Sequence, residues 1–202
     1  MRRALLIFLS LVLALAGWSA VCADDGFYVI SGVKRNYAPV PKTGCTTSSA
    51  AGDDGAWQKG ISSPSPRFTN NGNGTVTDLL TGLIWANGGI FKTWANALSL
   101  ANGLASGSAG LTDGSQVGDW RLPNIRELSS LIDYGQSFLA VPADFPFRNL
   151  IFDGPYWSST RSQSGGAFVV GFIPFSTHAS GESFSAPLNS SYTGVLCVRG
   201  GR

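Results

Sequence analysis

Apolar and polar residues alternate in short runs through much of the chain, and the breaks between the runs are rich in Gly, Asn and Ser. In RFTNNGNGTVTDLLTGLIW, residues 67–85, the Asn/Gly run and the later Thr-Gly pair predict two tight reversals between short strands, since Asn and Gly accept positive φ. Similar strand-like runs return in the second half of the chain. They cover residues 154–160, 167–172, 182–187 and 192–201.

Two helices are expected between the hairpin and these later strands. Apolar residues recur at helical spacing over 94–104, directly after Thr93, a residue type that caps helix N-termini. The second helix has the clearer start, because Asn124 and Glu127 have the spacing of a capping box. Gly135 marks its expected end. Helices gathered ahead of an antiparallel Gly/Ser-rich meander predict an α+β domain rather than a βαβ alternation.

Four tryptophans lie within these predicted elements and are best explained as core residues. A Trp side chain buries a large apolar area, which matters in a chain with 26 glycines. The default interpretation is therefore a core role rather than a stacking platform for a ligand. The four are Trp85, Trp94, Trp120 and Trp157.

The N-terminus has the three parts of a secretory signal peptide. A pair of arginines is followed by the apolar run 4–16 and by small residues that end at Ala23. This run is shorter than the roughly 20 residues needed to cross a bilayer, and no later segment is apolar enough to span one. We therefore expect export and no membrane span. A lipid anchor on Cys22 is less favoured, because Val21 stands where a small residue is required.

Cleavage after Ala23 would remove residues 1–23 and leave 202 − 23 = 179 residues, which suits one domain with an extension. Residues 24–62, rich in Gly, Ser, Pro and Asp, are assigned to an extension or linker, and residues 63–202 to the domain. The exported chain is formally neutral, because 14 − 2 = 12 Lys and Arg face 12 Asp and Glu. This balance argues against nucleic acid as a partner and against a general attraction to anionic membranes.

Export also limits the cysteine chemistry. Cys45 and Cys197 are the thiols that remain after cleavage, and in an oxidising compartment a disulfide between them is the simplest expectation. It would close a loop of about 150 residues, with an entropic contribution of roughly 4–5 kcal/mol at most. A catalytic thiol is the alternative, and it is disfavoured because neither cysteine has a His or acidic partner close in sequence.

The Asn-rich turn has a second interpretation, as a calcium loop. Asn71, Asn73 and Thr75 imitate the alternate oxygen ligands of such loops. However, neutral Asn is a weaker ligand than Asp, Asp78 is the one carboxylate in the run, and a bidentate Glu is missing. The hairpin explains every residue of the run, so no metal site is predicted, with weak calcium binding as the open alternative.

Five segments, in order along the chain, carry a family resemblance: PRFTNNGNGTVTDLLTGLIW, TWANAL, GDWRLPNIREL, YWSST and CVRG. Together, over residues 64–200, they resemble the Lcl C-terminal domain family, named from a collagen-like bacterial adhesin. The resemblance implies a C-type-lectin-like fold, distantly related to formylglycine-generating enzymes, in an exported bacterial protein. Many relatives carry cysteines after the LIW strand and after the first helix, where this chain has Gly88 or Gly89 and Ala109.

The kinship with formylglycine-generating enzymes raises an enzyme hypothesis, in which a cysteine pair and a metal activate oxygen. Two cysteines this far apart form no recognisable redox motif, and no His/Cys/Asp cluster has metal-ligand spacing. Asp113 and Asp119 flank the loop before WRLP, but loop aspartates are more often turn residues than a general acid and base. The calcium-binding EPN, QPD and WND motifs of sugar-binding C-type lectins do not occur in the sequence.

The segment 161–194, between YWSST and CVRG, is the expected recognition surface. Ser, Gly and Asn provide adaptable hydrogen bonding, and Phe, Tyr and Arg provide rigid contact area, as in antibody paratopes. Ordinary loops of a Gly/Ser-rich exported protein would explain the same composition. The side chains predicted to bind a ligand are Arg161, Gln163, His178, Asn189 and Tyr192.

These observations predict an exported, non-catalytic domain that binds a glycan or protein ligand in the periplasm, at the cell surface or after secretion. No catalytic residue and no cofactor is assigned. A fold is shared by many functions, so the ligand class stays open between these two. Two alternatives also stay open: a divergent enzyme related to formylglycine-generating enzymes, and a structural envelope component whose 161–194 loops are buried between subunits.

Overall fold

The computed structural model describes residues 21–22, 28–29, 40–89, 91–147, 154–174 and 178–200. The chain divides into two units, Met1–Pro39 and Val40–Arg202. In the smaller unit, strands β1 (Val21–Cys22) and β2 (Tyr28–Val29) pair antiparallel. Apart from β1, the predicted signal peptide lies outside the described residues.

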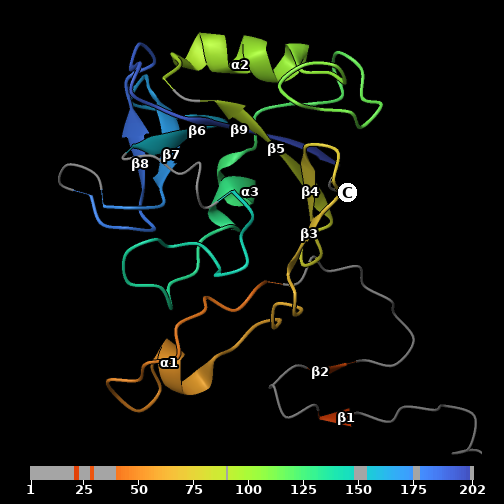
Figure 1. Cartoon of the computed structure of the whole chain (residues 1–202). Coiled ribbons are helices and arrows are strands. Elements are labelled where there is room, and N and C mark those ends of the chain that lie inside the picture. Colours follow the sequence, from red (N-terminus) through yellow and green to blue (C-terminus); the bar gives the residue numbers. More distant parts are fainter. Residues whose placement is uncertain are drawn as a thin grey trace, which may run out of the picture. The chain divides into compact units, whose positions relative to one another are not determined.

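Two antiparallel sheets form the framework of the larger unit (Figure 1). The first, in the order β3-β4-β5-β9, joins the predicted hairpin to the end of the chain. Its strands are β3 (Phe68–Asn70), β4 (Thr75–Asp78), β5 (Leu83–Gly89) and β9 (Val195–Gly200). The second, in the order β6-β7-β8, contains β6 (Pro155–Arg161), β7 (Ala167–Gly171) and β8 (Ser183–Ala186). The predicted mixture of helices and antiparallel strands is confirmed.

The described helices are α1 (Asp54–Trp57), α2 (Trp94–Gly103) and α3 (Ile125–Ser129). The predicted capping box is present at α3, because the Asn124 side chain accepts from the Glu127 N–H and the Glu127 carboxylate accepts from the Asn124 N–H. This helix ends at Ser129, earlier than the expected end near Gly135. Thr93 is the N-cap of α2 by position, but its side chain makes no capping hydrogen bond.

Two apolar clusters cover opposite faces of the strands, one with α3 and the other with α2. Figure 1 shows these two helices on opposite sides of the strands. Neighbouring residues of one strand enter different clusters: on β9, Val198 lies in the α3 cluster and Cys197 in the α2 cluster. Strands β7 and β9 are therefore largely buried on both faces, whereas β3 and β8 carry exposed side chains. Recognition then has to use loops and strand edges.

The tryptophans follow the core prediction with one exception. Trp85, Trp120 and Trp157 each have an exposed fraction of 0%. Trp85 lies in the α3 cluster, and the other two lie in the α2 cluster. Trp94 is half-buried and packs against the α2 cluster from the start of α2, which leaves part of its ring at the surface.

Residues 40–66, which include the end of the predicted extension 24–62, contact the rest of the larger unit. The Tyr134 N–H donates to the Thr43 carbonyl oxygen at 2.8 Å, so the chain after α3 bonds to this segment instead of continuing the helix. Gly44 has a φ of 88°, and an added Cβ would meet the Asp133 side chain of the same loop. The left-handed backbone explains why a glycine is favoured at this position.

A buried ion pair fixes the first hairpin to the end of α3. Arg67 donates to the two Asp78 oxygens from Nε and Nη2, at 3.0 and 2.8 Å, and Nη2 also donates to the Ser130 carbonyl oxygen at 2.8 Å. Asp78 accepts further bonds from the Leu80 N–H and the Thr81 hydroxyl. The two charged side chains are 5% and 0% exposed. Asp78, noted in the sequence only as the one carboxylate of the Asn-rich run, is therefore the centre of a buried network.

Candidate ligand-recognition site

The β6–β7 turn and the loop after β8 enclose a groove of about 470 Å³, lined by residues 164–166 and 185–189. We call it the recognition groove. Its two walls meet because β7 and β8 pair in a register that places Ala167 opposite Ala186. The groove carries hydroxyl and amide groups from Ser164, Ser185 and Asn189 and no charged side chain. All of it belongs to the segment that the sequence marked for recognition.

Arg161, at the end of β6, braces one wall of the recognition groove. Its Nε and Nη2 donate to two backbone carbonyls of the β6–β7 turn, both at 3.2 Å. Its guanidinium carbon lies 5.3 Å from the centre of the Trp94 ring, a cation–π distance. Gln163 is exposed in the same turn. The structure thus brings three of the predicted residues, Arg161, Gln163 and Asn189, to the groove and its rim.

Tyr192 lies beside an aromatic residue that the sequence analysis did not select. Tyr192 is 55% exposed and Phe91 is 45% exposed, and their ring centres are 5.1 Å apart with the planes tilted by 54°. Phe91 has a φ of 56°, in the left-handed region that residues other than glycine seldom adopt. Such outliers gather at functional sites, which makes the pair a candidate contact surface.

Two backbone bonds tie this aromatic pair to the recognition groove. The Lys92 N–H donates to the Thr193 carbonyl oxygen at 3.0 Å, and the Trp94 N–H donates to the carbonyl oxygen of Leu188, a groove residue, also at 3.0 Å. The start of α2 is therefore bonded to the β8–β9 loop at two points. We call the groove together with Arg161 and the aromatic pair the recognition surface.

His178 lies apart from the recognition groove. Its ring stacks on Phe184 with the ring centres 3.7 Å apart, and Nδ1 is 3.0 Å from a Glu182 carboxylate oxygen. These contacts hold the imidazole at the start of β8, whereas the groove lies at the end of that strand. The structure therefore does not bring His178 together with the groove residues that were predicted with it.

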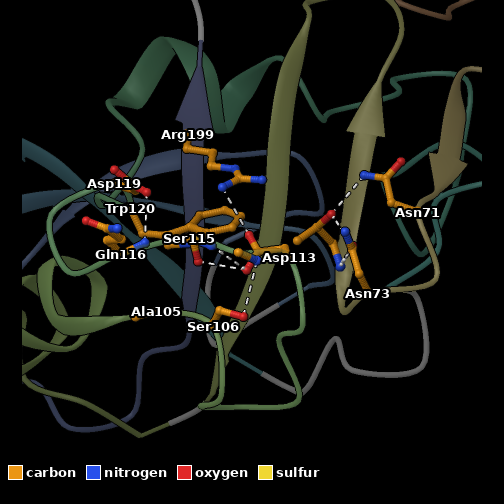
Figure 2. A network of polar contacts seen from close by, with 12 residues as sticks. Asn71, Asn73, Ala105, Ser106, Asp113, Ser115, Gln116, Asp119, Trp120 and Arg199 are labelled. Atoms are coloured by element: carbon orange, nitrogen blue, oxygen red, sulfur yellow. Dashed lines mark hydrogen bonds and ion pairs between the residues drawn. The ribbon is translucent and has the colours of Figure 1, made fainter.

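A polar network supports the loop before the WRLP motif (Figure 2). Asp113 Oδ1 accepts from the Ser115 N–H and hydroxyl at 3.2 and 2.7 Å, and Trp120 Nε1 donates to the same hydroxyl at 2.9 Å. Arg199 Nη1 lies 3.1 Å from Asp113 Oδ2, an ion pair without an aligned hydrogen bond. Asp119 accepts a backbone N–H of the loop. Both aspartates thus make the contacts of turn residues.

Replacing Asp113 by asparagine should destabilise the domain at neutral pH and much less in acid. Burial raises the pKa of the Asp113 carboxyl, but the Ser115 hydrogen bonds and the charge of Arg199 outweigh burial, so the net pKa is lowered. Such a group contributes stability above its unfolded pKa of about 4, and this stability is lost as the pH falls through the folded pKa. We expect a loss of about 1–3 kcal/mol in unfolding free energy at pH 7.

Urea unfolding of both proteins between neutral pH and about pH 3 measures this effect. The difference between Asp113→Asn and the parent should shrink below about pH 4. Asp119→Asn, at an exposed position of the same loop, is the control and should change stability by about 0.5 kcal/mol at most. If the loss of unfolding free energy in Asp113→Asn is the same at every pH in this range, the charge of Asp113 does not contribute to stability.

The Asn-rich turn uses its side-chain oxygens internally. Asn73 Oδ1 accepts from the Thr75 N–H and hydroxyl at 3.2 and 2.7 Å. The Asn71 amide nitrogen donates to the Thr75 and Thr77 hydroxyls at 2.8 and 3.0 Å. The predicted hairpin is confirmed by the pairing of β3 with β4. Within the described ranges, no three His, Cys, Asp or Glu side chains are grouped to hold a metal ion.

The two cysteines lie in different environments, and both thiols are free. Cys197 is enclosed in the α2 cluster, and burial raises the pKa of its thiol to about 12. Cys197 pairs with Ala86 on β5, and its sulfur lies near Gly88, where an added Cβ would be 2.9 Å from it. Cys45 is half-buried and lines a separate cavity of about 510 Å³ with Lys42 and Asp133. The predicted Cys45–Cys197 disulfide is therefore not formed in the structure.

The architecture and the site together define a mixed α/β domain, mostly antiparallel sheet, with a loop-built groove. Residues 74–199 match the Lcl C-terminal domain, which is more than half of the chain. The chain belongs to the Lcl C-terminal domain family, as the five sequence segments indicated, and membership points to an extracellular domain. No curated protein matches the chain. Among the described residues, no helix is long and apolar enough to cross a membrane.

Proposed function

We propose that this chain is an exported, non-catalytic binding domain of C-type-lectin-like fold that holds an extracellular glycan or protein on the recognition surface. One observation carries the proposal: two loops of paratope-like composition meet around a groove of about 470 Å³. Ligand sites commonly have volumes of roughly 300–1,000 Å³. No cofactor and no catalytic residue enters the proposal.

The side chains of the recognition surface offer complementary kinds of contact. Arg161 uses Nε and Nη2 to hold the β6–β7 turn, and its Nη1 can donate to an acceptor on a ligand. Tyr192 and Phe91 offer exposed aromatic area, and aromatic and arginine side chains carry much of the energy at binding sites. The hydroxyl and amide groups of the groove can match a sugar or a peptide backbone. These contacts suit a polar, largely uncharged ligand with at least one apolar face.

The scaffold beneath these loops supports recognition. Strands β6, β7 and β9, which carry these loops together with β8, are largely buried, so their ends are held in place while the loop side chains stay accessible. Backbone bonds from Lys92 and Trp94 join the β8–β9 loop to the start of α2. A rigid framework lowers the ordering cost of binding, which favours affinity without a conformational change.

Arrays of glycans and extracellular proteins, probed with the full exported chain, test the proposal. We expect selective binding to one class, at the same strength with added calcium and with a chelator, because the oxygens of the Asn-rich turn are engaged within the hairpin. Loss of binding with the chelator would contradict the metal-free part of the proposal. Failure to bind any member of either array would contradict the proposed binding function as a whole.

A divergent enzyme is the second candidate, favoured by one observation. The half-buried Cys45 shares its cavity with Lys42, three residues before it, and with Asp133, which is distant in sequence. Cys45→Ser separates the two candidates: a binding domain keeps its affinity for an array ligand, whereas an enzyme that uses the thiol loses turnover of its substrate. A structural envelope component would instead sediment as a stable oligomer with the recognition surface inaccessible.

A further inference from the structure

Strand β8 forms the outer edge of the three-stranded sheet. Within the described parts of the chain, no strand pairs with its far side, and Figure 1 shows it at the outside of the sheet. The side chains of Ser183 and Ser185 are exposed, Phe184 is half-buried and Ala186 is buried. The strand is therefore anchored by one face while its edge stays accessible.

The pairing of β7 with β8 fixes which backbone groups point outward. The Gly171 N–H donates to the Glu182 carbonyl oxygen at 2.9 Å, and hydrogen-bonded pairs of an antiparallel ladder recur every second residue. The next bonded pair is therefore Val169 with Phe184, which directs the Phe184 backbone groups inward. Ser183 and Ser185 then direct their N–H and carbonyl groups away from the sheet. These four groups form a short template for one more strand.

The edge strand itself carries no charge, bulge or proline, although Glu182 and Pro187 flank it. Natural edges are protected by charged side chains, bulges or prolines. Residues 183–186 carry no charge, and their pairing with β7 shows no register shift. Pro187 follows directly and limits the template to this short stretch. An edge with so few outward groups needs a further contact to bind firmly.

The recognition groove supplies that contact. Ser185 lines the groove, and its hydroxyl lies 3.3 Å from the hydroxyl of Ser164 on the opposite wall. Residues directly opposite each other on paired strands place their side chains on the same face of the sheet. The side chain that an added strand sets beside Ser185 would therefore point toward the groove. The groove is lined by uncharged residues, so it suits an uncharged side chain.

We propose that β8 accepts an extended peptide segment of a partner protein as a fourth strand, with one uncharged side chain seated in the recognition groove. The inference rests on the proposed binding function and selects the protein class of ligand. Main-chain hydrogen bonds to Ser183 and Ser185 hold the segment, and the groove selects one of its side chains, as in other cases of strand addition. The edge of β8 binds main-chain groups, so many peptide sequences can pair with it. Selectivity for one peptide over another comes from the groove.

A displayed library of random peptides, panned on the full chain, tests the inference. We expect enrichment of peptides without charge at one central position, with binding weakened by at least about tenfold in Ser185→Pro. Proline removes the outward N–H at this position but leaves the inward bonds of Phe184 in place. Ser185→Ala is the matched control, because it keeps the backbone donor, and should bind with a loss of less than about threefold.

A second measurement keeps the test valid if Ser185→Pro fails to fold. N-methylation of the enriched peptide at alternate residues should abolish binding, and methylation at the intervening residues should not, because only alternate N–H groups face the edge. Equal tolerance at both sets of positions would overturn the inference. So would enriched peptides that bind folded Ser185→Pro as tightly as the parent, or a library that yields no binders.

Other outcomes separate this inference from the proposed function. Array binding to glycans alone, without any peptide binding, would keep the proposed function and overturn strand addition. Concentration-dependent self-association that Ser185→Pro abolishes would show that the occupant of the edge is a second copy of the chain, which also overturns the partner segment. Failure of both the arrays and the peptide library would remove the proposed function and the inference together.

Discussion

Replacing Arg67 by methionine is expected to lower the free energy of unfolding by about 3–5 kcal/mol. The methionine fills the space of the arginine stem but leaves the carboxylate of Asp78 buried without its ion-pair partner. It also removes the donor to the Ser130 carbonyl oxygen, which joins the hairpin to the end of α3. Urea unfolding followed by tryptophan fluorescence gives the change, because buried tryptophans report on the core.

Arg126→Met provides the matched control for this prediction. Arg126 is exposed on α3, and its loss should change stability by about 0.5 kcal/mol at most. A double variant that also replaces Asp78 by leucine should lose less than the sum of the two single variants, because the unpaired buried charge is then absent. If Arg67→Met is as stable as Arg126→Met, the buried ion pair does not hold the hairpin.

Trp157→Ala should also destabilise the domain by about 3–5 kcal/mol. Trp157 is fully buried in the α2 cluster, and its Nε1 donates to the Lys92 carbonyl oxygen at 2.7 Å. Truncation leaves a cavity and an unsatisfied carbonyl next to the recognition surface. The same denaturant measurement applies to both variants, with the slope of the transition checked for a change in the unfolded state.

Trp57→Ala is the control for this truncation, since Trp57 is 60% exposed at the end of α1. It removes the same type of side chain and should lower the free energy of unfolding by about 0.5 kcal/mol or less. Equal losses in the two variants would contradict the assignment of Trp157 to the core. A large loss of unfolding free energy in Trp57→Ala alone would show instead that an exposed tryptophan stabilises residues 40–66.

Local rules predicted the parts of the fold that local chemistry determines. The Asn/Gly turn specifies the first hairpin because Gly72 and Gly74 adopt left-handed backbone and the Asn side chains bond within the turn. Asn124 and Glu127 specify the start of α3 through a reciprocal pair of hydrogen bonds. The predicted end of α3 was wrong, because after Ser129 the backbone makes tighter turns and then bonds to residues more distant in sequence, from Asp133 to Ala140 and from Tyr134 to Thr43.

The arrangement of the recognition surface depends on contacts that no local pattern encodes. Phe91 reaches the surface through a left-handed backbone that phenylalanine seldom adopts, so its role is visible only in three dimensions. His178 was grouped with the other recognition residues by segment, but its stacking on Phe184 holds it at the other end of β8. In contrast, Arg161 is brought beside the groove by its pairing with Ala167, and Asn189 lines the groove after the register of β7 with β8 has set the end of β8.

The cysteines illustrate the same limit. Counting thiols after export predicts one disulfide, since no other partner is available in the sequence. Counting gives no distances, and the structure places Cys197 inside the α2 cluster beside Gly88 and Cys45 in a cavity lined by Lys42 and Asp133. Disulfide geometry is restrictive, so an even count alone is a weak basis for assigning a bridge.

The most direct test of the account is the affinity of four single variants for a ligand identified on the arrays. Arg161→Ala and Tyr192→Ala should each weaken binding by about 2 kcal/mol, or about 30-fold, while their melting temperatures stay near that of the parent. His178→Ala, away from the groove, and Val117→Ala, at an exposed apolar position of another loop, should bind like the parent. Unchanged affinity in folded Arg161→Ala and Tyr192→Ala would contradict the assignment of the recognition surface.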